Sequence, residues 1–220
     1  MFYQNIFQSL FKCRRIDEQI TEQDRLLNRR IISCILYSPA ISTLSLEDKD
    51  SDVSTDDQTE IFDVVDLDDQ VIGRATRKEC NSDPDLIHRA VFVLIYNDKG
   101  QLLWQKRSET KDTNPGRWVT SASGHVDVGE GYKETAVREV REELGVDVDV
   151  EFLGKFLFHY TNETEYSAIF RAHSNGPFDF NREDISEIRF MTIGEILKKE
   201  KEGTLQLAKA VHYIMESLSI

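Results

Sequence analysis

The sequence predicts an α/β/α sandwich with a mixed β-sheet, preceded by a helical extension. Three observations predict it: short apolar segments with strand character, one amphipathic helix between them, and two further helices near the end of the chain. Strands that surround a central helix and carry helices on both faces form this layered architecture. With 220 residues, of which 40% are hydrophobic, one core domain plus an extension is the simplest organisation.

The first part of the chain is expected to lie outside the core domain. Residues 1–37 have the spacing of one or two helices, and their first 16 residues contain three basic and no acidic residues. These features resemble a mitochondrial transit peptide, but a helix docked on its own domain or on a partner is favoured. Residues 38–60 are rich in Ser, Thr and acidic residues and are expected to form an acidic flexible linker. The core domain is expected to span residues 61–220.

The core domain opens with predicted strands. Residues 61–65 and 71–75 flank an Asp-rich turn and are typical of a hairpin. Residues 89–96 are almost continuously apolar, which is typical of a strand covered on both faces. Residues 101–107 follow the turn sequence Asn-Asp-Lys-Gly and are expected to return along that strand. Further strands are predicted at residues 148–160, 166–171 and 188–191.

Helices are predicted in the middle and at the end of this domain. Residues 131–144 predict the central helix, and Gly145 is expected to end it because glycine readily adopts the left-handed conformation found there. A short helix from Ile193 and a longer one at 205–218 follow, and the longer one has its apolar side chains on one face. Trp118 is expected in the core.

Composition limits the function classes. The formal net charge of −13 argues against a nucleic-acid polymer as partner, since that requires a basic face. The three cysteines are scattered, so neither a disulfide framework nor a zinc site is indicated, and a cytoplasmic location fits best. No apolar stretch approaches the roughly 18 to 20 residues that span a bilayer. A homodimer is one assembly state compatible with the sequence.

Three glutamates of the central helix carry the strongest functional signal. Glu139, Glu142 and Glu143 stand at i, i+3 and i+4, so their carboxylates project from one side of the helix. Like charges this close repel one another, and the C-terminal half of a helix disfavours negative charge. A divalent cation that prefers carboxylate oxygens, such as Mg²⁺, would resolve both effects. The glutamates alone are more typical of a solvated helix face.

The wider sequence frame resembles the Nudix box. Residues 124–146 read Gly, five residues, Glu, seven residues, Arg-Glu-Val, one residue, Glu-Glu, one residue, Gly-Val, and they match every fixed position of that motif. The resemblance implies the Nudix fold and hydrolysis of a nucleoside diphosphate derivative or a related small diphosphate. It also implies Mg²⁺ or Mn²⁺ as cofactor, so a pyrophosphatase activity on a small phosphorylated substrate is expected.

The same resemblance implies roles for individual residues. Metal ligands would be Glu139, Glu142, Glu143 and the backbone carbonyl of Ser123. Glu142 or Glu139 would also act as the catalytic base. The remaining box residues would be structural: Gly124, Glu130, Arg138 and Gly145, with Glu130 bracing Arg138 in an ion pair.

A second resemblance covers residues 86–171. The strings HRAVFVLIYNDKGQLL, QKRSETK, NPGRW and SASGHV are similar to type I isopentenyl-diphosphate isomerase and its hydrolase relatives. His88 and His125 match metal-binding histidines of the isomerase, Glu163 and Glu165 match its Glu-x-Glu pair, and Arg107 and Lys111 match basic residues that bind the diphosphate. On this basis His125 and Glu165 are expected to join the metal ligands. Substrate contacts are expected from Arg107, Lys111, His88 and Glu163.

Departures from the isomerase pattern favour hydrolysis. Ser123 stands where the isomerase requires a cysteine, and a hydroxyl is far less acidic than a thiol. Asn81 stands at the position of the first metal-binding histidine, whereas Glu139 and Glu142 complete a glutamate set that the isomerase lacks. Isomerase activity and a catalytically silent module that binds a nucleotide or a protein are the alternatives. The downstream acids are expected to be solvated loop residues: Glu183, Asp184 and Glu187.

Overall fold

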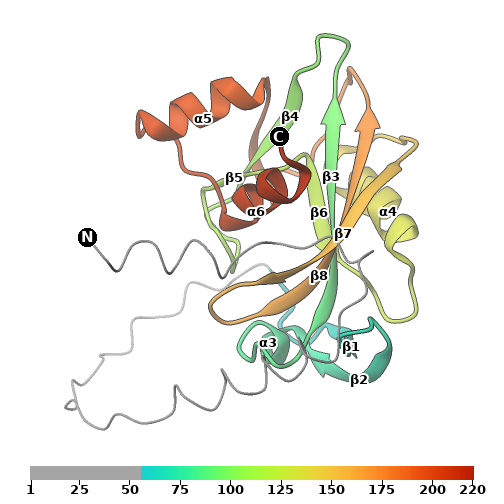
Figure 1. Ribbon diagram of the computed structural model, residues 1–220. Coiled ribbons are helices and arrows are strands. Elements are labelled where there is room, and N and C mark those ends of the chain that lie inside the picture. The colour runs from blue at the N-terminus through green and yellow to red at the C-terminus, as the bar shows by residue number, and fades with distance from the viewer. Residues whose placement is uncertain (1–55) are drawn as a thin grey trace, which may run out of the picture.

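The computed structural model describes residues 56–220 of the chain (Figure 1). The predicted helical extension and most of the predicted linker lie outside these described residues. Residues 56–60, which the sequence assigned to the linker, contact the domain instead. The backbone N–H of Asp112 donates to Asp56 Oδ2 at 3.0 Å, and Gln58 Nε2 donates to Asp112 Oδ2 at 2.9 Å. The domain therefore includes residues that precede the predicted boundary at residue 61.

The described residues form a two-stranded and a seven-stranded sheet. The smaller is the predicted antiparallel hairpin of β1 (Ile61–Val65) and β2 (Val71–Thr76). The larger has the order β5-β4-β3-β8-β7, with β6 paired to β3 and β9 paired to β4. Its strands are β3 (His88–Tyr96), β4 (Leu102–Arg107), β5 (Trp118–Val119), β6 (Ala122–His125), β7 (Glu151–His159), β8 (Thr164–His173) and β9 (Ile185–Met191).

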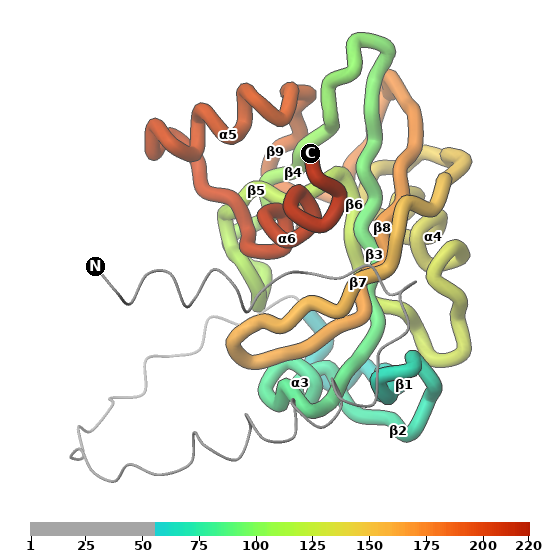
Figure 2. The backbone as a smooth tube through the Cα atoms, viewed as in Figure 1, coloured from blue at the N-terminus to red at the C-terminus, as the bar shows by residue number. Residues whose placement is uncertain are grey.

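The central strand β3 makes the larger sheet mixed. It runs parallel to β8 and antiparallel to β6, so that Val91 lies between Ala168 and Gly124. Successive side chains of a strand point to opposite faces, and both faces of β3 are apolar. Figure 2 shows this strand passing through the middle of the domain. Because the side chains on both faces of β3 are buried in the core, this strand fixes the position of the segments that surround it.

Helices cover both faces of this sheet (Figure 1). The predicted central helix, α4 (Tyr132–Leu144), packs its buried Ala136, Val140 and Leu144 against one face. The other face is covered by α5 (Ile193–Lys201) and α6 (Lys209–Leu218), which share a core cluster with β3 and β4. Trp118 belongs to this second cluster, as predicted. The α/β/α sandwich predicted from the sequence is therefore confirmed.

Among the differences from the prediction are the start of the last helix and the pairing of one strand. The last helix begins at Lys209 and not at residue 205, because residues 206–208 pair with β5: Trp118 N donates to Gln206 O and Ala208 N donates to Trp118 O. Strand β4 pairs with β3 only at Leu102 and otherwise lies between β5 and β9. In both cases the deciding contact comes from a segment distant in sequence.

A short helix, α3 (Arg77–Cys80), was not predicted. Thr76 caps it: the Thr76 hydroxyl accepts from Glu79 N, and the Glu79 carboxylate accepts from Thr76 N. The Thr-x-x-Glu spacing of a capping box was the available sequence signal. No helix within residues 56–220 has the length and apolar character needed to cross a bilayer.

Asp69 holds the hairpin on the sheet. Its carboxylate accepts hydrogen bonds from Arg89 Nε at 2.6 Å and from the hydroxyl of Tyr132 at 3.0 Å, and it also pairs with Lys155. These partners come from β3, α4 and β7, so one carboxylate in the turn of the hairpin joins three elements. The hairpin in turn holds Phe62 against the site described below.

Candidate active site

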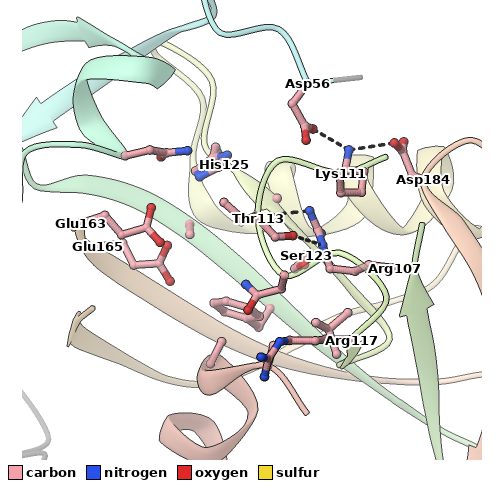
Figure 3. A pocket seen from close by; sticks show the side chains of 18 of the residues that line it. Asp56, Arg107, Lys111, Thr113, Arg117, Ser123, His125, Glu163, Glu165 and Asp184 are labelled. Atoms are coloured by element: carbon pink, nitrogen blue, oxygen red, sulfur yellow. Dashed lines mark hydrogen bonds and ion pairs between the residues drawn. The ribbon is translucent and has the colours of Figure 1, made fainter. Parts of the chain in front are cut away.

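A cavity of about 810 Å³ opens between α4, α6, β6 and the turn between β7 and β8 (Figure 3). Most of the site residues predicted from the sequence line it: Arg107, Lys111, Ser123, Gly124, His125, Glu139, Glu142, Glu143, Glu163 and Glu165. His88 and the structural residues Glu130, Arg138 and Gly145 lie outside its lining. The fold thus brings the glutamate helix, the two basic residues and the Glu-x-Glu pair around one space.

Helix α4 presents its glutamates to this cavity because of how it ends and where it packs. Gly145 terminates the helix in the left-handed conformation, with φ of 67°, as predicted. Gly124 of β6 lies so close to the helix that a Cβ atom there would come within 2.1 Å of the Glu139 carboxyl. A glycine at this position is therefore what allows Glu139 to reach the cavity.

Arg138 holds two of the three glutamates. It donates to Glu139 Oε1 at 2.7 Å and to Glu142 Oε2 at 3.1 Å through Nη1. Its Nη2 donates to Glu130 Oε2 at 3.0 Å and to the backbone oxygen of His125 at 3.2 Å. The Glu130–Arg138 ion pair implied by the box is thus present, and it ties the helix to the strand before it.

Glu143 is held from the opposite side. Its Oε2 accepts from Gln105 Nε2 at 2.8 Å and from the backbone N–H of Ser123 at 3.2 Å. Burial, together with the neighbouring glutamate charges, raises the pKa of Glu139, and burial also raises the pKa of Glu143. Carboxylates that repel each other at the wall of a cavity form a donor set that suits a hard divalent cation.

A second group of potential ligands lies at the edge of this cavity, where His125 and Glu165 line it and His88 lies behind them. Ligand atoms of His88, His125 and Glu165 all lie within 4.8 Å of one another, a spacing that could hold a metal ion. The ring of Phe62 stacks on both histidines, with centroids 5.5 Å from His88 and 4.4 Å from His125. Glu165 accepts from the hydroxyl of Tyr160 at 3.1 Å and from Ser167 Oγ at 2.7 Å. Contacts from Phe62, Tyr160 and Ser167 therefore hold these potential ligands in place.

The position of His88 corrects one prediction. The ring is 0% exposed and does not line the cavity, so direct contact with substrate does not fit. Both of its ring nitrogens lack a hydrogen-bond partner within residues 56–220, and burial lowers its pKa to about 4. A buried imidazole with unpartnered nitrogens is suited to a metal ion, since Glu165 Oε2, 4.0 Å from Nε2, lies beyond hydrogen-bond distance.

The two predicted phosphate-binding residues differ in their surroundings. Arg107 donates through Nε to the backbone oxygen of Thr113 at 2.8 Å and makes no ion pair with any residue in 56–220. Lys111 contacts Asp56 Oδ1 at 2.5 Å and Asp184 Oδ1 at 2.8 Å (Figure 3). An incoming phosphate would have to compete with two carboxylates for the Lys111 ammonium group.

Several cavity residues were not identified as site residues from the sequence, among them Asp56, Arg77 and Asp184. Asp56 fell in the predicted linker, and Asp184 was expected to be a solvated loop residue but binds Lys111 instead. Arg77 of α3 contacts Glu60 at 3.0 Å and Asp112 at 3.2 Å. These partners are up to 73 residues apart in sequence, and no local pattern signals such pairs.

The Asp56 contacts predict a pH-dependent stability. Burial raises the pKa of Asp56, but hydrogen bonds with Asp112 and Lys111 and the charge of Arg77 outweigh burial and hold this pKa well below its usual range. The unfolded chain therefore binds the proton more readily, so the contribution is complete above about pH 3.9 and is lost as pH falls further. Asp56→Asn is expected to be less stable than wild type at pH 7, with a smaller difference at pH 3. Urea unfolding at both pH values tests this, with exposed Asp149→Asn as control.

Gly124→Ala is expected to fold and to lose activity. The added Cβ would displace the Glu139 carboxyl, which is the movable end of the contact. Since misplacing a reacting group by about 1 Å can lower rates on the order of 10²-fold, kcat should fall by that order. Gly194→Ala is a matched control, because a Cβ there meets nothing within 4 Å. Equal kcat values for the two variants would contradict the assigned role of Gly124.

Comparison with known proteins identifies the family. The family model of the NUDIX domain matches residues 86–213. The Nudix hydrolase YfcD of Escherichia coli strain K12 is 36% identical over 155 residues, which is 70% of this chain and 85% of that protein. Isopentenyl-diphosphate Delta-isomerase 2 of Photorhabdus laumondii is 30% identical over 139 residues, 61% of this chain and 78% of that protein.

A solved structure agrees with these matches. The crystal structure of DR0079 from Deinococcus radiodurans has a TM-score of 0.63 and 26% identity, and covers 72% of this chain and 99% of that one. The family model alone spans more than half of the chain and contains the helix with the three cavity-facing glutamates. The chain therefore belongs to the Nudix family, as a pyrophosphohydrolase of the branch that resembles type I isopentenyl-diphosphate isomerase.

Proposed function

We propose that this pyrophosphohydrolase uses Mg²⁺ or Mn²⁺ to hydrolyse a diphosphate bond in a nucleoside diphosphate derivative or a related small diphosphate. One observation carries the proposal. Each α4 glutamate has one oxygen held by the protein: Glu139 Oε1, Glu142 Oε2 and Glu143 Oε2. Within residues 56–220, the second oxygen of each accepts no hydrogen bond, so three free carboxylate oxygens remain at the cavity for a cation.

The residues at the cavity fit such a cation. Glu139, Glu142 and Glu143 would hold it together with the backbone carbonyl of Ser123, and His125 and Glu165 supply a second donor group across the cavity. When bound, a divalent cation supplies the positive charge that makes water a better nucleophile and stabilises the leaving oxygen.

The protein residues contribute positioning and proton transfer. Glu142 or Glu139 would accept a proton from the attacking water as its oxygen bonds to one phosphorus, while the bond from that phosphorus to the bridging oxygen breaks. Arg107, which has no acidic partner among residues 56–220, would bind one of the two phosphate groups of the substrate. Lys111 and Glu163 would contact the substrate from the two ends of the cavity.

Isomerase activity is the second candidate, because the His88–His125–Glu165 group resembles the metal site implied by the isomerase relatives. Ser123 argues against it. A hydroxyl at the position of the required thiol is a much weaker acid, and the complete glutamate set serves hydrolysis.

A panel of diphosphates tests the proposal. The purified chain with Mg²⁺ or Mn²⁺ is incubated with nucleoside diphosphate sugars, dinucleotides, oxidised nucleotides and isopentenyl diphosphate, and released phosphate, nucleotide and allylic product are measured. Metal-dependent release of a nucleotide or phosphate is the expected result. Allylic product without phosphate release would establish the isomerase instead, and nucleotide binding with no hydrolysis would establish a silent module.

A further inference from the structure

Gln105 is a polar residue at a buried position of β4 that faces the core. It lies on β4, where alternate residues face opposite sides of the sheet. Leu103, two residues earlier, belongs to the core cluster beneath α4, whereas Leu102 and Trp104 face the α6 side. Gln105 therefore faces α4 and is only 2% exposed. Burying an amide there is unfavourable unless its hydrogen bonds are made.

Both hydrogens of the Gln105 amide are used. Nε2 donates to Glu143 Oε2 at 2.8 Å and to the backbone oxygen of Ser121 at 3.3 Å. Because Ser121 is itself fixed in the sheet region by hydrogen bonds from its hydroxyl to Leu103 O and from Ile95 N, the amide has one orientation available. Its N–H group is thereby aimed at a single oxygen of Glu143.

This contact has a consequence for the metal site. Together with the Ser123 N–H, Gln105 occupies Glu143 Oε2, so that Oε1 is the oxygen left for a ligand. We propose that Gln105 is a positioning residue that fixes the Glu143 carboxylate for divalent-cation binding from the strand side of the cavity. This inference rests on the proposed function, since it assumes that the glutamates hold a cation.

The absence of charge on Gln105 is as important for the proposed cation site as its hydrogen bond to Glu143. Arg138 already contributes a positive charge next to Glu139 and Glu142. A second cation against Glu143 would reduce the negative charge that attracts a divalent ion. An amide orients the carboxylate without neutralising it. Residues that hydrogen-bond to metal ligands typically contribute about 10- to 100-fold to metal affinity or activity.

Metal binding by the full chain tests this role independently of turnover. Mn²⁺ is titrated into wild type and Gln105→Met, and free Mn²⁺ is followed by electron paramagnetic resonance. Methionine is similar in length and packs in apolar surroundings, so the variant is expected to fold. The expected result is a Kd for Mn²⁺ weaker by about 10-fold or more. At saturating Mn²⁺, the KM for substrate should change little.

Two further variants complete the experiment. Gln101→Met makes the same exchange just before β4, where the amide oxygen accepts from Asn97 and the side chain does not line the cavity, so it should leave the Kd for Mn²⁺ unchanged. Gln105→Asn keeps the amide but shortens it, and it should weaken Mn²⁺ binding as Gln105→Met does. Wild-type affinity in both Gln105 variants would overturn the role of Gln105. No Mn²⁺ binding by the wild type would overturn the proposed function as well.

Discussion

Glu142→Gln is expected to lower kcat by on the order of 10²- to 10⁴-fold while the protein keeps its fold. Glutamine has the same shape but cannot accept a proton from water, and its neutral amide binds a divalent cation more weakly than a carboxylate does. The Glu142 side chain is 59% exposed, and among residues 56–220 its ion pair is with Arg138, so little of this part of the fold depends on its charge. Turnover of whichever diphosphate the panel identifies, measured with saturating Mn²⁺, gives the result.

The control for Glu142→Gln lies on the same helix. Glu134 is exposed in the first turn of α4 and does not line the cavity, so Glu134→Gln should leave kcat unchanged. Circular dichroism and the unfolding midpoint should match wild type for both variants. A Glu142→Gln enzyme with wild-type kcat would remove this glutamate from the mechanism and leave Glu139 as the candidate base.

Among these variants, Arg138→Met is expected to cause the largest decrease in the free energy of unfolding. Its guanidinium group contacts Glu130, Glu139 and Glu142, and the first two of these carboxylates are only 21% and 12% exposed. Removing one partner of a partly buried ion network leaves charges without compensation, which lowers the free energy of unfolding by about 3 kcal/mol. Denaturant unfolding in the presence of a chelator measures this loss.

Arg141 provides the matched control for Arg138. Its ion pair with Asp147 is exposed, with side chains 63% and 76% accessible, so Arg141→Met should change the unfolding free energy by less than about 1 kcal/mol. Saturating Mn²⁺ should reduce the deficit of Arg138→Met, because a ligand that binds only the folded state stabilises it. Equal losses for the two arginine variants would contradict the bracing role of Arg138.

Local patterns accounted for the central part of the site. The spacing of Glu139, Glu142 and Glu143 predicted a shared helix face, and Gly145 ends that helix as expected. The spacing of apolar residues predicted the helix and sheet layers, because the faces of a helix or strand that are buried determine where apolar residues occur in its sequence. The match to a motif of 23 residues then supplied the chemical interpretation of the helix.

Residues that act across long sequence separations were not predictable. In the sequence, nothing distinguishes Gln105 from other strand residues. Only the fold brings it into contact with Glu143, 38 positions later. Asp56 lay in a composition typical of a linker, yet it pairs with Lys111, 55 residues away. His88 was expected to touch substrate, but tertiary packing buries it completely. Such pairings depend on the assembled sheet, and no period or local spacing encodes them.

The hairpin that carries Phe62 has a practical consequence for the limits of the catalytic unit. The family match begins at residue 86, but Phe62, which stacks on both site histidines, and the cavity residues Asp56 and Arg77 all precede it. A fragment trimmed to the matched region would lack Phe62, which stacks on both histidines, and the cavity residues Asp56 and Arg77. The smallest piece that retains every cavity residue found within 56–220 must therefore start no later than residue 56.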